Sequence, residues 1–253
     1  MTTEVRIKKQ FKKCCYYCGL PYSSIEHAPP KQLFKGFPCD KFKVPSCDKH
    51  NNDKSGSDNA VIKAMLIAMD TVAHKYPPNE DVLEAIRQTK SHFSQVKRQV
   101  LNINKFTNQP PLTHVASQVQ MENWMRQLTA AIIYSAIRRY DPGNSFDQAL
   151  VFSPNFVSGG PTKEGLEIAQ ILKIEQGQEE SLKQNNWQSG WASGRRNYPA
   201  GIYYFEVTFE YSEEVVFRHH FFDSWLWYVA VRTSEQSRNK ILQKVLNKVD
   251  SMV

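Results

Sequence analysis

Four residues that are good zinc ligands come in two pairs near the start of the chain. Cys15 and Cys18 form the first pair and Cys47 and His50 the second, each with two residues between its members. This spacing lets both side chains of a pair turn toward one ion, and two pairs complete the tetrahedral shell of a structural Zn²⁺. Disulfide pairing is the competing interpretation, but an odd count of five Cys in a cytoplasmic chain disfavours it. The pattern therefore predicts a structural zinc site.

Two further cysteines fall outside these pairs. We expect Cys14 and Cys39 to be free structural thiols, although Cys14 adjoins the first pair and could compete for the metal.

Residues suited to phosphodiester hydrolysis lie between the zinc pairs and directly after them. Glu26 and His27 precede Lys31, and Asn51 and Lys54 follow the second pair. Hydrolysis needs a proton acceptor for water, and the imidazole of His27 titrates near neutral pH. A carboxylate and an amide oxygen, from Glu26 and Asn51, suit Mg²⁺ or Mn²⁺ while leaving positions for phosphate and water. Both lysines could reach a phosphate oxygen.

Together, Cys15-x-x-Cys18, Glu26-His27 and the stretch from Val44 to Ser55 resemble the HNH endonuclease family, of the type with a zinc-binding staple. The resemblance covers residues 15–58. It implies a ββα-metal fold, in which a two-stranded hairpin and a helix hold one divalent cation. The first strand would end near His27, the second would run from Phe42 to Val44, and the helix would begin near Ser46. The zinc would clamp the hairpin's entrance to the helix start.

The resemblance also implies the roles of the site residues. His27 would be the general base, with Lys54 beside it in the catalytic centre, and Glu26 and Asn51 would hold the catalytic Mg²⁺ or Mn²⁺. Lys31 and Lys54 would contact the nucleic acid, and the products would carry a 5′-phosphate and a 3′-hydroxyl. Adjacent strand residues point to opposite faces, so Glu26 and His27 can share one site only if the strand ends there.

The sequence departs from the family pattern at two positions. Phe42 stands where the family has its middle asparagine, which weakens the catalytic interpretation, and Glu26 stands where Asp is commoner. Spacing alone also leaves Asn52 open as the ligand in place of Asn51.

Charge supports a polyanionic partner. The net charge is +7, and residues 1–65 hold 12 Lys and Arg against 6 Asp and Glu, which leaves 20 against 19 for the rest. A local basic field attracts phosphate backbones, although a solvated surface would have the same composition. The longest apolar stretch, Trp225 to Val231, is much shorter than the roughly 20 residues of a membrane span. Since no secretory signal is recognisable, we expect a cytoplasmic protein.

Periodicity predicts an α+β fold in which the amino-terminal unit is followed by helices and then by a mainly antiparallel sheet with a terminal helix. We place the nuclease module at 1–58, a helical region at 59–140 and an α+β targeting or sensing region at 141–253. Helices are expected from Asn59 to about residue 76, at about 82–100, 121–139 and 166–174, and from a capping box at Thr233 and Gln236; strands are expected at 149–152, 202–211, 215–222 and 225–231. We expect His219 and His220 to be structural, with one of them facing out.

The function expected is metal-dependent cleavage of nucleic acid, with double-stranded DNA as the favoured substrate. The family suggests restriction, antiviral defence or mobile-element biology in bacteria or phage. One alternative is a zinc module that binds nucleic acid without cutting it. Another is an assembly protein whose carboxy-terminal sheet binds a second copy or a partner protein.

Overall fold

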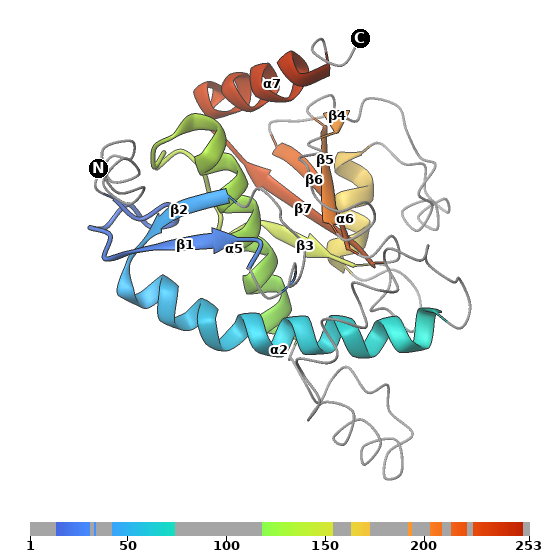
Figure 1. Ribbon diagram of the computed structural model, residues 1–253. Coiled ribbons are helices and arrows are strands. Elements are labelled where there is room, and N and C mark those ends of the chain that lie inside the picture. Colours follow the sequence, from blue (N-terminus) through green and yellow to red (C-terminus); the bar gives the residue numbers. More distant parts are fainter. Residues whose placement is uncertain are drawn as a thin grey trace.

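The computed structural model describes residues 14–30, 33, 42–73, 118–153, 163–172, 192–193, 203–208, 214–221 and 225–249. Their elements, in chain order, are β1 (Ser24–Ala28), β2 (Phe42–Ser46), α2 (Asp48–Ala73), α5 (Gln118–Ile137), β3 (Leu150–Phe152), α6 (Lys163–Ile171), β4 (Ala192–Ser193), β5 (Tyr203–Thr208), β6 (Glu214–Phe221), β7 (Trp225–Arg232) and α7 (Glu235–Val249) (Figure 1). The strands form a two-stranded sheet, β1–β2, and a five-stranded sheet of order β3-β7-β6-β5-β4. The expected mixture of helices with a carboxy-terminal antiparallel sheet and a terminal helix is confirmed.

The larger sheet forms where aromatic and β-branched residues dominate the sequence. β7 pairs antiparallel with β3 on one side and with β6 on the other, so the apolar run at 225–231 is an inner strand, as predicted. In β5, Phe205 and Val207 are buried while Tyr204 and Glu206 are half-buried. Because successive side chains point to opposite faces, each strand contributes to two packed layers.

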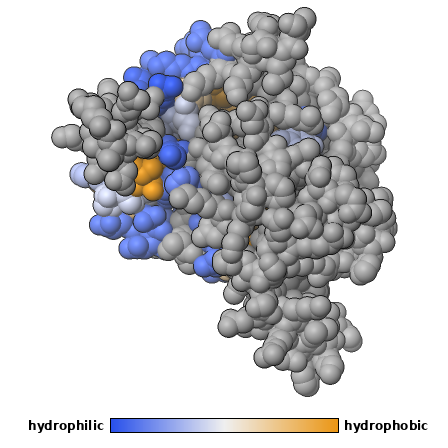
Figure 2. Space-filling model, in the orientation of Figure 1, coloured by the Kyte–Doolittle hydropathy of each residue, from blue (hydrophilic) through white to orange (hydrophobic). Residues whose placement is uncertain are grey.

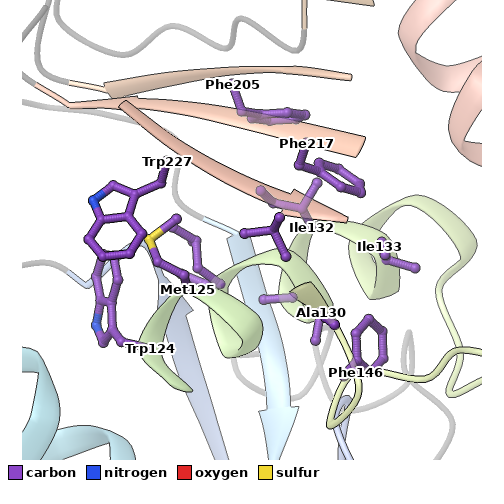
Figure 3. Packing of buried hydrophobic residues seen from close by; sticks show 14 of the residues in the cluster. Trp124, Met125, Ala130, Ile132, Ile133, Phe146, Phe205, Phe217 and Trp227 are labelled. Carbon is purple, nitrogen blue, oxygen red and sulfur yellow. The ribbon is translucent and has the colours of Figure 1, made fainter. Parts of the chain in front are cut away.

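Helix α5 lies between the β1–β2 hairpin and one face of the larger sheet (Figure 1). Its residues from Leu128 to Tyr134 are all buried, as expected of a helix that is packed on every side. Figure 3 shows Met125 and Ile132 of this helix beneath Phe217 and Trp227 of the sheet. The hairpin and the sheet therefore share the core that α5 supplies.

Helix α6 covers the opposite face of the sheet. Ile168 and Leu172 pack there against Val216 and Tyr228 in a second, smaller hydrophobic cluster. Arg218 emerges on the same face of β6 as Val216, and it is fully buried.

The side chains of this buried arginine and of a neighbouring histidine meet at one carboxylate. Arg218 donates through Nε to Oε2 of Glu206 over 2.8 Å, and Nε2 of His220 lies 2.8 Å from the same oxygen. Burial opposes ionisation of Glu206, but His220 and the charge of Arg218 outweigh it and lower the pKa of this carboxyl. The positive charge of Arg218 is therefore paired with the carboxylate of Glu206 inside the protein.

Both histidines of β6 are buried, which corrects the expectation that one of them faces out. His219 points to the α5 side, where Nε2 lies 2.9 Å from Oγ1 of Thr129 and Nδ1 lies 3.0 Å from the hydroxyl of Tyr203. His220 points to the α6 side. His219 contacts Thr129 of α5, and His220 stacks on Tyr204 and contacts Glu206, both of β5, so neither side chain is exposed.

Helix α2 runs without a break from Asp48 to Ala73. The expected boundary between residues 58 and 59 therefore falls inside a helix, and the helix expected from Asn59 continues one that starts earlier. The first turns of α2 are polar, so they show no apolar period in the sequence. Val44 of the hairpin, Met65 of α2 and Leu128 of α5 all belong to one hydrophobic core.

Helix α7 begins one residue later than its capping signal suggested. Oγ of Ser234, and not Thr233, accepts a hydrogen bond of 3.1 Å from the backbone N–H of Ser237. Ser234 also donates to the carboxylate of Asp141, which ties the start of α7 to the turn after α5. Two adjacent hydroxyl residues precede the helix, and the cap falls on the second because Asp141 is within its reach.

Some predictions fall outside the described residues, namely the helix at 82–100 and the positions of Lys31 and Cys39. Among the helices that are described, none is long and apolar enough to cross a membrane.

Candidate metal centre

The first pair of predicted zinc ligands lies in a tight loop that we call the cysteine loop (residues 14–21). The backbone N–H of Cys15 donates to the carbonyl of Leu20 over 2.6 Å, and that of Gly19 donates to the carbonyl of Cys15 over 3.1 Å. Gly19 has a φ of 74°, the left-handed conformation that closes the turn. The N–H of Tyr16 donates to the carbonyl of Pro45 over 2.8 Å, which attaches the loop to β2.

The second pair lies where β2 ends and α2 begins. The carbonyl of Cys47 accepts from the backbone N–H of Asn51 over 2.9 Å, the first hydrogen bond of the helix. His50 is in the first turn, so its ring can reach back toward Cys47.

The structure brings all four predicted ligands together. The ligand atoms of Cys15, Cys18, Cys47 and His50 lie within 4.8 Å of one another. The Sγ atoms of Cys18 and Cys47 are 3.8 Å apart, and Nδ1 of His50 lies 3.7 Å from Sγ of Cys15 and 3.2 Å from Sγ of Cys47. A tetrahedral zinc site with ordinary bond lengths has S···S edges of about 3.8 Å and S···N edges of about 3.6 Å. The cluster therefore fits a Cys₃His zinc centre in both donor type and spacing.

The thiols of this cluster differ in their readiness to ionise. Burial raises the pKa of Cys15 to about 12, in spite of opposing backbone hydrogen bonds. Burial also acts against Cys47, but the backbone N–H of His50 and contacts with the other two thiols outweigh it and lower the pKa of this residue. Of these two thiols, Cys47 is the better prepared to be a thiolate, as is common at the start of a helix.

Tyr17 joins the cysteine loop to the segment after α5. Its ring lies 4.7 Å from the ring of His50 and 5.6 Å from that of Phe146, measured between centroids. Its hydroxyl donates to Oδ1 of Asp147 over 2.8 Å. A cleft of about 450 Å³ opens at this junction, between the loop and residues 140–148, and Lys49 is part of its lining. Sequence reasoning missed Tyr17 and Asp147. The only signal for Tyr17 was its position between two ligand cysteines, and Asp147 had none.

The proposed catalytic pair lies in the middle and not at the end of a strand. β1 continues through Glu26 and His27 to Ala28, one residue beyond the ending that convergence requires. Glu26 is only 7 % exposed, on the same face as Ala28, whereas His27 is half-buried on the other face. The structure therefore holds these two side chains on opposite faces of the hairpin.

The buried carboxylate of Glu26 is close to Tyr16. Burial raises the pKa of Tyr16 well above its usual value, and the negative charge of Glu26 raises it further. A carboxylate in this position offers an oxygen ligand for a cation on the core side of the hairpin.

The remaining predicted residues lie along α2. Asn51 is half-buried in the first turn, Asn52 is exposed, and Lys54 follows one turn after His50. The carboxylate of Glu26 and the amide of Asn51 fit a hard divalent cation by donor type.

The ligand cluster lies where α2 begins, and polar residues follow it along this helix, which contacts β1 of the hairpin that bears His27. Phe42, where the resembling family has an asparagine, begins β2 opposite Ala28. Comparison with models of known protein families, with curated proteins and with solved structures finds no match to this chain.

Proposed function

We propose that the part of the chain around β1, β2 and the start of α2 is a zinc-stapled, metal-dependent endonuclease module of the HNH type that hydrolyses DNA. The observation that carries the proposal is the order of the hairpin, the ligand cluster and the helix along the chain. A hairpin bearing His27 leads directly into a helix bearing Asn51, and a Cys₃His cluster lies at their junction. This is the arrangement that the sequence resemblance implies.

Zinc would act in this module as a structural clamp. Cys15 and Cys18 would bind it from the cysteine loop, and Cys47 and His50 from the start of α2. So short a unit buries little apolar surface, and metal binding contributes folding free energy in such cases. The clamp would fix the hairpin relative to the helix.

His27 would accept the proton of the attacking water, because imidazole is the side chain best matched to neutral pH. Glu26 and Asn51 would hold the Mg²⁺ or Mn²⁺ ion, which neutralises charge at the scissile phosphate. Because Glu26 and His27 lie on opposite faces of β1, the proposal requires the end of this strand to open when the cation and DNA bind. Lys54 and Lys31 would provide phosphate contacts. The products would be a 5′-phosphate and a 3′-hydroxyl, and the setting would be restriction, defence or mobile-element biology in bacteria or phage.

The second candidate is a zinc module that binds nucleic acid without cutting it. It is favoured by the opposite orientation of Glu26 and His27 on β1 and by the burial of Glu26. Phe42 in the place of the family's asparagine points the same way.

A plasmid cleavage assay separates the two candidates. The full-length, zinc-loaded protein is incubated with supercoiled DNA with and without Mg²⁺ or Mn²⁺, beside the variants His27→Ala and Lys163→Ala. Lys163 lies on α6, and 84 % of its side chain is exposed, so it controls for nonspecific effects. Loss of a general base costs about 10²- to 10⁴-fold in rate, whereas the control should cut normally.

Metal titration adds a second distinction. Glu26→Ala and Asn51→Ala should regain part of their cutting at high Mg²⁺, because more cation compensates for weaker binding. His27→Ala should not, since a cation cannot replace a proton acceptor. Cutting by His27→Ala at the parental rate would refute the proposed centre. Absence of cutting in every sample, with DNA binding retained, would establish the binding module instead.

A further inference from the structure

The two faces of the β1–β2 hairpin differ in chemistry. Residues directly opposite each other in an antiparallel pair lie on the same face. Glu26 pairs with Val44, and both are buried against the core. His27 pairs with Lys43, which is exposed, and His27 is half-buried. The outer face thus presents a lysine beside the histidine proposed to act in hydrolysis.

The distance between these two residues suits one phosphodiester group. In antiparallel strands, the Cβ atoms of two directly opposite residues are about 4.5–5.5 Å apart. A phosphate oxygen held by the lysine would therefore be close to the imidazole. Among the residues that the structure describes, Lys43 has no ion-pair partner.

We propose that Lys43 binds the phosphate backbone of DNA next to His27, which makes the outer face of the hairpin the surface that receives the strand. The proposal rests on the nuclease function proposed above for the identity of the polyanion. Lys43 is a substrate-positioning residue, because its ammonium group supplies a charge and three donors but accepts no proton.

Three features favour a phosphate backbone as the occupant. Residues 1–65 carry nearly all of the excess positive charge of the chain. Where the described residues are visible around the hairpin, hydrophilic residues surround a small hydrophobic patch (Figure 2). The position of Lys43 is fixed by the strand register, so this charge comes from a rigid element and not from a loop.

Binding of a fluorescent duplex of about 20 base pairs, measured by anisotropy without Mg²⁺ from 50 to 200 mM KCl, tests the proposal. Lys43→Gln should weaken binding by roughly fivefold to tenfold near 100 mM salt and reduce the slope of log K against log salt by about 1. Lys43→Arg should restore the slope. Lys163→Gln, which removes the same charge from α6, should match the parent.

The outcomes separate this inference from the nuclease proposal. An unchanged salt slope in Lys43→Gln overturns it, and so does a parent that binds polyglutamate but no DNA, because the face would then receive an acidic protein. A reduced slope in a protein that never cuts supports Lys43 as a DNA contact while the nuclease proposal fails. A reduced slope together with Mg²⁺-dependent cutting supports both. Zinc content equal to that of the parent shows that each variant is folded at the hairpin.

Discussion

The indole of Trp124 on α5 donates a hydrogen bond of 2.6 Å to Oδ1 of Asp58 on α2. Trp124 is 1 % exposed, so the bond joins two helices from inside the protein. Hydrogen bonds to charged groups contribute about 1.5–3 kcal/mol. We expect Trp124→Phe to lower the free energy of unfolding by at least that amount, as measured by urea denaturation.

Asp58→Asn is the matched control for this contact. It keeps an acceptor oxygen opposite the indole and should cost less than Trp124→Phe. The two substitutions act on one bond, so the double variant should fall short of the sum of the single effects. Strict additivity would show that the charge of Asp58 adds nothing to the bond.

Zinc content is the second prediction. The purified protein should contain about one zinc per chain, because the four ligands complete one tetrahedral shell. Cys47→Ala should lose most of this metal, since it removes the thiol whose pKa is lowered. Cys14→Ala should keep it, because Cys14 is not among the clustered ligands. Metal analysis that finds equal zinc in both variants would exclude the proposed ligand set.

The third prediction concerns the turn of the cysteine loop. A Cβ on Gly19 would lie 2.5 Å from Cε1 of Tyr140, and the backbone has a φ of 74°. Gly19→Ala should destabilise the protein by about 1–2 kcal/mol from the backbone alone, and the clash adds to this. Combining it with Tyr140→Ala should relieve the clash but not the backbone strain. Thermal unfolding of the parent, the single variants and the double variant would separate the two parts.

The fourth prediction is a pH dependence that comes from His219. Burial lowers the pKa of this residue from 6.5 to about 3, with a smaller contribution from His220. The unfolded chain therefore takes up a proton below pH 6.5 that the folded chain excludes. Stability from this group is full above pH 6.5 and falls until about pH 3. Between pH 7.5 and 5.0 the loss should be about 2 kcal/mol.

His219→Gln should reduce this pH dependence, whatever it costs in absolute stability. Urea denaturation of both proteins at pH 7.5 and 5.0 gives the free energy of unfolding. The quantity to compare is the loss of this free energy on acidification, in the parent and in the variant. A parent and a variant that lose the same stability on acidification would show that His219 is charged in the folded protein.

The sequence predicted those features that depend on short-range spacing. Cys47 and His50 share one ion because two intervening residues return the chain to the same side, and this needs no knowledge of distant packing. The inner position of β7 followed from its continuous apolar run. The start of α2 followed only from the resemblance, because its polar first turns have no apolar period.

Features that depend on contacts between distant segments were missed. Ala130 and Ala131 of α5 are buried because the hairpin lies on the side opposite the sheet, and small residues carry no periodic signal of that kind. One of the two histidines His219 and His220 was expected to face out, but both are buried. The orientation of Glu26 depended on where β1 ends, and Pro29 and Pro30 did not fix that ending to within one residue.

The burial of α5 on every side has a consequence for how the protein melts. Its residues from Leu128 to Tyr134 complete the packing of the hairpin on one side and of the five-stranded sheet on the other. If the hairpin separated first, one side of α5 would be exposed to water. The half-exposed helix would then stabilise the sheet less well. Heating should therefore produce a single cooperative transition for both parts. A chelator that withdraws the zinc should lower the melting temperature reported by tryptophans of the distant sheet.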